Sequence, residues 1–203
     1  CTGKVGDICS GAGEAAQMED LGTSDSNDLF DLCNSRHLVL WGKNPAVSNV
    51  HLVPILKEAQ ARGARITLID PVHHKSVGLA DTYLQPAPGS DFELALGIAR
   101  ALFDRGQVDP KAASFCDHLP EFQRLAQSRT VAEWAARADL PVAAVLDLAD
   151  RFADGPTAIL VGWGMQRRQR GGAIVRALDA LSAISGNLFR SGGGVSFYFR
   201  RRK

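Results

Sequence analysis

Residues 38–70 contain a strand, a helix and a second strand, and this unit constrains the fold more than any other part of the sequence. The apolar run Leu38–Trp41 suits a strand that is covered on both faces. Apolar residues then repeat at helical spacing from about residues 51–54 to Gly63, which is placed to end a helix. The second strand is ARITLID, residues 64–70. A strand, helix and strand of these lengths form a right-handed parallel unit, so the sequence predicts an α/β fold.

Strands and helices continue to alternate along the rest of the chain. Further strands are expected at residues 81–85 and 157–164, and helices from 91 to about 104, between 110 and 153, and over 171–187. Ser90 with Glu93 and Thr130 with Glu133 have the spacing of capping boxes. The pattern predicts a mostly parallel, Rossmann-like sheet flanked by helices. The tail, residues 191–203, has no predicted partner, and its last residues are expected to be loose.

Composition excludes several functional classes. Lys and Arg number 23 against 22 Asp and Glu, so a net charge of +1 gives no reason to propose nucleic acid as a partner. Two basic runs, residues 167–170 and 200–203, are typical of solvated faces. The four cysteines contain no Cys-x-x-Cys pair, which favours a reducing compartment; the cytoplasm is expected, and the periplasm stays open. No apolar run approaches the roughly 20 residues that cross a bilayer.

Four loops carry residue types suited to ligand binding. They are the loop that follows Trp41, the loop that begins at Asp70, the turn before the helix at residue 91, and the loop after the strand at 157–164. Each alone is explained by a turn or a helix cap. In an open parallel sheet, however, ligands bind beyond the carboxyl ends of the strands, so four such loops together predict a ligand site. The sequence lacks the glycine-rich fingerprint of NAD sites and the P-loop of ATP sites.

Five motifs, in this order, carry a family resemblance: LVLWGKNPAV, ITLIDPVHHKSVGLAD, PGSDFELALGIA, LVGWGM and SGNLFRSGGGV. They resemble the middle part of the molybdopterin oxidoreductases, a family that includes formate dehydrogenases and nitrate reductases. The resemblance implies one molybdenum held by two molybdopterin guanine dinucleotides, with two pseudo-symmetric α/β domains that each bind one guanosine end. It further implies that residues 1–153 form one guanosine-binding domain and residues 154–203 the returning segment of the second.

The resemblance also assigns site residues, one loop at a time. Trp41, Gly42 and Asn44 would line the pyrophosphate and guanosine pocket of one dinucleotide. Its ribose would be approached by the next loop, through Asp70, Pro71 and His74. Its guanine would be contacted by the turn that follows, through Gly89, Ser90 and Asp91. The last loop would lie nearer the pterin through Gly164, Met165 and a glutamine. A short deletion relative to common members leaves Gln166 and Gln169 as alternatives, and Gln169 is the first choice.

Cys9 is the candidate catalytic residue and metal ligand. In the segment DICSGAGEAAQ it stands where the family has its protein ligand to molybdenum. A soft thiolate suits a metal already bound by dithiolene sulfurs. The alternative for an isolated cysteine is a small, buried apolar residue. The other cysteines, Cys1, Cys33 and Cys116, are assigned to packing or to chance occurrence.

The predicted function is therefore the central cofactor-binding fragment of a molybdenum-dependent oxidoreductase. Such an enzyme moves two electrons between a small substrate, such as formate or nitrate, and an electron-transfer partner. By the resemblance, an iron–sulfur cluster belongs to a preceding region and a β-barrel-like domain to a following one, so the fragment alone is expected to be inactive. The alternatives are a non-catalytic nucleotide-binding module, the central domain of a thiamine diphosphate enzyme, or an interaction domain that uses the basic tail.

Overall fold

The computed structural model describes residues 11–24, 26 and 28–197 of the chain. Its α-helices are α1 (Gly11–Leu21), α2 (Pro45–Ser48), α3 (Leu52–Ala61), α4 (Asp91–Asp104), α5 (Leu119–Gln127), α6 (Val131–Ala138), α7 (Val142–Asp154) and α8 (Gly171–Ile184). Its strands are β1 (His37–Trp41), β2 (Arg65–Ile69), β3 (Thr82–Leu84), β4 (Thr157–Val161) and β5 (Gly194–Ser196). Four short 3₁₀ helices are described as well: η1 (Leu29–Asn34), η2 (Lys75–Leu79), η3 (Ala112–Ser114) and η4 (Trp163–Arg167).

The strands form one sheet in the order β3-β2-β1-β4-β5, with every described pairing parallel. Trp41 pairs with Ile69 on one side and with Val161 on the other, so three strands end at the same level. The chain winds outward in one direction from β1 to β3 and in the other from β4 to β5. In such doubly wound sheets, ligands bind beyond the carboxyl ends of the strands where the winding reverses, here between β1 and β4.

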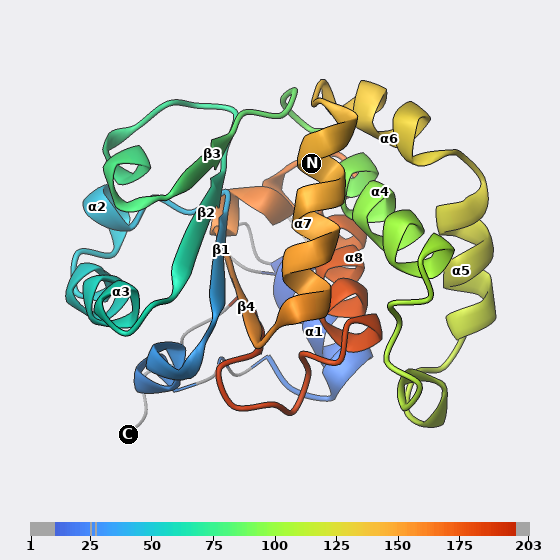
Figure 1. The fold of residues 1–203 in the computed structure, drawn as a ribbon, viewed down its shortest axis with the longest axis horizontal. Helices are drawn as coiled ribbons and strands as arrows, with labels where there is room; N and C mark the ends of the chain where they lie inside the picture. The colour runs from blue at the N-terminus through green and yellow to red at the C-terminus, as the bar shows by residue number, and fades with distance from the viewer. Residues whose placement is uncertain (1–10, 25, 27, 198–203) are drawn as a thin grey trace, which may run out of the picture.

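Both faces of the sheet are covered by helices, as Figure 1 shows. On one face, alternate strand residues such as Leu38 and Leu40 pack against Leu52 and Leu56 of α3. On the other face, the intervening strand residues, such as Val39 and Trp41, join a larger core to which α4, α6, α7 and α8 contribute. The strands are therefore apolar on both sides, as the sequence predicts, and the α/β prediction is confirmed. Among the described residues, every helix is either too short or too polar to cross a bilayer.

Helix boundaries agree with the sequence more closely than helix caps do. Gly63, with φ +98°, ends α3 as predicted, and the capping box of Thr130 with Glu133 is present. The capping box of Ser90 is wrong, although α4 begins at Asp91 as predicted. The Ser90 hydroxyl donates backwards to the Ala87 carbonyl at 2.7 Å. Its backbone (φ −93°, ψ 15°) lacks the extended conformation in which a serine caps the turn that follows it.

The tail also differs from the prediction. Residues 194–196 have a partner, because they form β5 and pair with β4 from Ala158 to Leu160. Residues 198–203 lie outside the described part of the chain. The strand predicted at 157–164 ends at Val161, since η4 begins two residues later. The proposed domain boundary at 153/154 stays a prediction; β4 and β5, which follow it, belong to the same sheet as β1.

Asn187 joins three segments and supports the first stability prediction. Its side chain is fully buried; Oδ1 accepts a hydrogen bond from the Thr157 amide at 2.8 Å, and Nδ2 donates to the Phe152 carbonyl at 2.9 Å. Asn187→Ala leaves both backbone groups buried without a partner, and each such group costs about 1–3 kcal/mol. We expect the free energy of unfolding in urea to fall by about 3 kcal/mol. Asn49→Ala, in the half-exposed turn after α2, is the control and should change it by less than about 0.5 kcal/mol. An equal, small change in both variants would contradict the prediction.

Helix α1 packs on α8 through polar side chains. The Gln17 amide donates to Asp179 Oδ1 at 3.1 Å, and Arg176 Nε donates to Asp20 Oδ1 at 2.8 Å. Asp179 is only 2% exposed, and burial raises the pKa of its carboxyl to about 7. Burial raises the pKa of the nearby Asp20 too. The contact between α1 and α8 therefore depends on the protonation state of a buried acid.

Asp179→Asn should change how stability depends on pH. Because the folded protein retains a proton on Asp179 that the unfolded chain releases, rising pH between about 4 and 7 lowers the free energy of unfolding. An asparagine removes this loss, so the variant should gain on the order of 4 kcal/mol relative to wild type between pH 4 and pH 8. Urea unfolding at several pH values measures the difference. Asp147→Asn, on the exposed side of α7, is the control, and a pH-independent difference for Asp179→Asn would contradict the assignment.

Candidate functional site

The loops after β1 and β4 meet at the carboxyl edge of the sheet. The Gly42 amide donates to the Ile69 carbonyl, and the Gly162 amide donates to the Trp41 carbonyl, both at 2.8 Å. Gly42 has φ +62°, and a Cβ there would collide with the sulfur of Met165. A Cβ at Gly162 would likewise collide with the Gly42 carbonyl. Both glycines are therefore required for the two loops to approach each other, and Gly42 lies against Met165.

Trp41, Asp91 and Arg168 form a buried polar contact at this edge. The Trp41 indole N–H donates to Asp91 Oδ1 at 3.0 Å, and Arg168 lies 3.2 Å from Oδ2. Trp41 is fully buried and Asp91 is 2% exposed. Burial raises the pKa of Asp91, while the indole and the Arg168 guanidinium act in the opposite direction. The assignment of the 167–170 run to a solvated face is thus wrong for Arg168, whose guanidinium reaches back to the first turn of α4.

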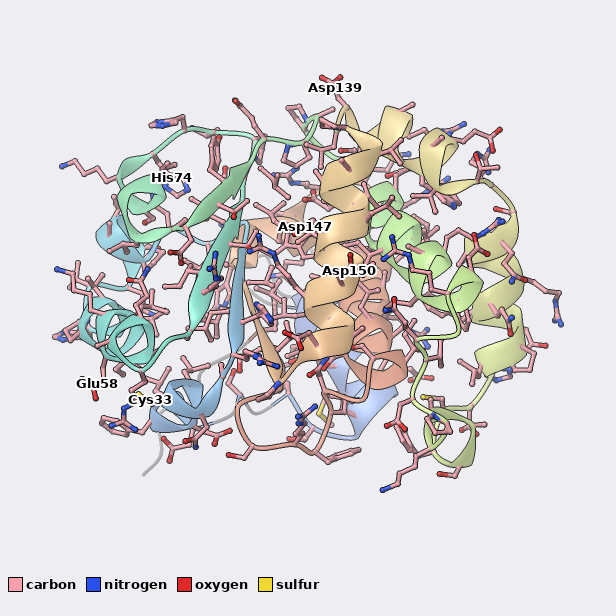
Figure 2. The ribbon with its side chains drawn as sticks, viewed as in Figure 1. Cys33, Glu58, His74, Asp139, Asp147 and Asp150 are labelled. Atoms are coloured by element: carbon pink, nitrogen blue, oxygen red, sulfur yellow. The ribbon has the colours of Figure 1, made fainter. Side chains whose placement is uncertain are left out.

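The loop after β2 is organised by Asp70 and His74. Asp70 Oδ1 accepts from the Val72 amide at 2.8 Å, and Asp70 Oδ2 lies 3.2 Å from His74 Nε2. His74 Nδ1 accepts from the Ser76 amide at 3.3 Å, so a neutral ring carries its proton on Nε2. Nε2 is close to Asp70 but makes no hydrogen bond there. Figure 2 shows His74 on this loop, beyond the end of β2. The Pro71 carbonyl accepts from Gln85, so the whole turn is held in place.

Asn44 connects the first two loops. Its Oδ1 accepts a hydrogen bond from the Ser76 hydroxyl at 2.7 Å, and Ser76 in turn accepts from the Ala46 amide at 3.0 Å. Ser76 is fully buried and was missed by the sequence analysis, because a serine in a loop carries no pattern of its own. These two hydrogen bonds therefore hold the loops after β1 and β2 together.

A polar hollow of about 280 Å³ joins the last two loops. Gly89, with φ +85°, and Gln169 both line it, together with Pro88, Phe92, Glu93, Arg168, Arg170 and Ile174. Ser90 and Asp91 follow Gly89 directly but are buried. Neither Gly89 nor Gly164 has another atom within 4 Å of a Cβ position, so a ligand could approach the backbone at both.

The two candidate glutamines have different surroundings. Gln166 is 6% exposed, and its Oε1 accepts a hydrogen bond from the Gly13 amide at 2.7 Å. Gln169 is exposed and lines the hollow. The geometry therefore favours Gln169 as the glutamine that a ligand can reach. Its role in binding stays a prediction.

Two further features concern charge and cysteine. Lys43, between Gly42 and Asn44, is buried, and desolvation lowers the pKa of its ammonium group to about 8.

Cys9 lies outside the described residues, but α1 begins two residues after it. Cys33 is near Glu58, at the end of the molecule opposite to His74 in Figure 2, so it is remote from the site loops.

Comparison with known proteins decides the family. The family model described as Molybdopterin oxidoreductase matches residues 1–199 of the chain. The chain belongs to the molybdopterin oxidoreductase family. The resemblance drawn from the five motifs is thereby confirmed.

Two relatives and one solved structure show how much of a family member the chain spans. It is 37% identical over 196 residues to a probable oxidoreductase, YyaE, of Bacillus subtilis, covering 95% of this chain and 29% of the relative. It is 32% identical to an assimilatory nitrate reductase of Haloferax mediterranei, covering 89% of this chain and 25% of the relative. Acetylene hydratase from Pelobacter acetylenicus shares the fold, with a TM-score of 0.74 at 21% identity over 88% of this chain and 24% of that one. The chain thus spans less than a third of the length of these molybdopterin oxidoreductase relatives and of that structure.

Proposed function

We propose that the chain is the central cofactor-binding fragment of a molybdenum oxidoreductase and that the carboxyl edge of its sheet binds one molybdopterin guanine dinucleotide. The observation that carries this proposal is the convergence of the four motif loops at the reversal point between β1 and β4. Membership of the molybdopterin oxidoreductase family supports a molybdenum–pterin cofactor. The guanine dinucleotide form and the residue roles are the further step that we propose.

The residues at this edge fit an extended, anionic ligand. Open backbone at Gly89 and Gly164 permits close approach, and the Asn44 amide can donate hydrogen bonds. Lys43 supplies a positive charge whose pKa is lowered by desolvation. A phosphate near its ammonium group would raise that pKa again, because an opposite charge favours the protonated form. We assign Gly42, Lys43 and Asn44 to the pyrophosphate and its adjoining guanosine. Trp41, which is fully buried, would act on the guanosine end through its hydrogen bond to Asp91.

Asp91 is the proposed guanine contact. A carboxylate can accept two hydrogen bonds from the guanine N–H groups, but both Asp91 oxygens already have partners. Binding guanine would therefore require Arg168 to leave Oδ2, whereas Trp41 could keep holding Oδ1. Arg168 favours the ionised state of the carboxyl until that exchange. Asp70, held by Val72 and His74, would face the ribose.

Cys9 is the proposed protein ligand, and molybdenum, when bound, would supply two-electron redox chemistry on a small substrate such as formate or nitrate. The chain itself would bind the nucleotide, orient the cofactor and provide the thiolate. An electron-transfer partner, and an iron–sulfur cluster in a preceding region, belong to the same proposal by family resemblance. A fragment that holds only part of the cofactor cage should not turn over substrate.

Cofactor analysis of the full-length protein tests this proposal. We expect one molybdenum per chain and two equivalents of GMP after acid hydrolysis of the bound cofactor. Thiamine diphosphate, or the absence of both molybdenum and bound nucleotide, would instead support the central domain of a thiamine diphosphate enzyme or a non-catalytic module. Molybdenum with a different released nucleotide would refute the guanine contact at Asp91.

A further inference from the structure

The first turn of α1 is bound to the loop after β4 by one buried hydrogen bond. The Gly13 amide donates to Gln166 Oε1 at 2.7 Å across 153 residues of sequence. A Cβ at Gly13 would collide with the ring of Phe197, and a Cβ at Gly171 would collide with the Gln166 carbonyl. Glycine at both positions therefore allows α1, α8 and the β4 loop to meet closely.

This hydrogen bond satisfies a donor that the helix cannot satisfy itself. The first four amides of any α-helix lack an intrahelical acceptor, and Gly13 is the third residue of α1. A nearby serine or aspartate usually supplies the missing acceptor. Here the acceptor is a glutamine of η4, so the N-terminal end of α1 is fixed relative to the loop after β4 at the carboxyl edge of the sheet.

The rest of the contact between α1 and α8 is polar and directional as well. Gln17 contacts Asp179 and Asp20 contacts Arg176, so positions 13, 17 and 20 place all three contacts on one face of α1. The buried residues of this helix are Gly13, Ala16 and Gln17, and of these only Ala16 has an apolar side chain. Burying one methyl group contributes only about 1 kcal/mol. Hydrogen-bond geometry, rather than apolar area, therefore sets the position of α1.

We propose that Gln166 is a positioning residue for Cys9: it caps α1 from the β4 loop and so fixes the point from which the chain leads back to the proposed metal ligand. This inference rests on the proposed function, because Cys9 precedes α1 by only one intervening residue, Ser10. It also separates the two glutamines by role. Gln169 faces the ligand, and Gln166 faces the protein.

The test uses four variants of the full-length protein. Gln166→Leu removes the acceptor, Gln166→Asn shortens it by one methylene, and Gln166→Glu retains it. Gln127→Leu, the same chemical change at the exposed end of α5, is the matched control. Three readouts are needed: amide hydrogen exchange of the peptide that contains Gly13, alkylation of Cys9 by iodoacetamide followed by mass spectrometry, and the number of sulfur ligands in molybdenum X-ray absorption.

We expect Gln166→Leu and Gln166→Asn to accelerate both exchange and alkylation at least tenfold and to lose one sulfur from the metal. Gln166→Glu should rescue all three readouts, which loss of general stability would not allow, and Gln127→Leu should leave them unchanged. Wild-type exchange and alkylation in both Gln166→Leu and Gln166→Asn would overturn the proposal. Faster exchange in these variants, together with a wild-type protein that lacks molybdenum, would support the cap and refute the proposed function. If Gln166→Leu does not fold, the Asn and Glu pair makes the same comparison.

Discussion

Cys9→Ala should abolish turnover by the full-length protein while leaving its fold intact. Replacing a group that only supports a metal ligand costs about 10–100-fold in activity or metal affinity, so loss of the ligand itself should cost at least about 100-fold. The fold should survive, because the hydrogen bonds that hold α1 to η4 and α8 are made by Gly13, Gln17 and Asp20. Turnover of whichever of formate and nitrate the wild-type protein accepts is the measurement, with thermal unfolding as the check on folding.

Cys33→Ser and Cys116→Ser are the matched controls for this substitution. Both thiols are partly buried and free, and Cys33 lies far from the site loops in Figure 2. Each control should keep activity within about threefold of wild type. A substitution at these positions should change the free energy of unfolding by about 1 kcal/mol or less, and it does not touch the site loops. A Cys9→Ala protein that is as active as these controls would remove Cys9 from the metal.

Asp91→Asn should be the most damaging single change to cofactor retention. A hydrogen bond to a charged group contributes about 1.5–3 kcal/mol, so losing the negative charge should weaken binding of the guanosine end about 10–100-fold. The neutral amide also presents a donor where guanine presents its own. Molybdenum and released GMP per chain, measured after extended dialysis of the full-length protein, report the loss.

Asp104→Asn, at the opposite end of α4, makes the same chemical change away from the site. Asp104 pairs with Arg100 on the helix surface, and its substitution should leave cofactor content unchanged. Equal cofactor content in Asp91→Asn and Asp104→Asn would mean that Asp91 serves only to hold Trp41 and Arg168. Thermal unfolding of both variants separates cofactor loss from loss of folding.

Local patterns in the sequence were sufficient to predict the α/β class of this fold and most of its strands and helices. Apolar runs such as Leu38–Trp41 report strands that are covered on both faces, and helical spacing followed by Gly63 reports where a helix ends. The loops that bear Trp41, Asp70 and Asp91 could be placed on one edge because parallel strands share the direction of their carboxyl ends. The resemblance of the motifs to a known family then predicted that those loops bind a cofactor.

Contacts between distant segments could not be predicted in the same way. Arg168 and Asp91 are 77 residues apart, and Gln166 and Gly13 are 153 apart, so no local spacing relates them. The strand at residues 194–196 is short and follows glycines, and its pairing with β4 depends on the sheet already being formed. Ser90 has the spacing of a cap, but the conformation of the Gly89–Ser90 turn directs its hydroxyl backwards.

We propose that the carboxyl edge of this sheet, between β1 and β4, holds a guanylated pterin whose metal is bound by Cys9. A crystal structure of the full-length protein with its native cofactor tests it most directly. We expect guanine hydrogen-bonded to Asp91, phosphates beside the loop that carries Gly42 and Asn44, and a bond from the Cys9 sulfur to molybdenum. A cofactor bound elsewhere, with Asp91 still paired to Arg168 and no sulfur from residue 9 on the metal, would contradict it.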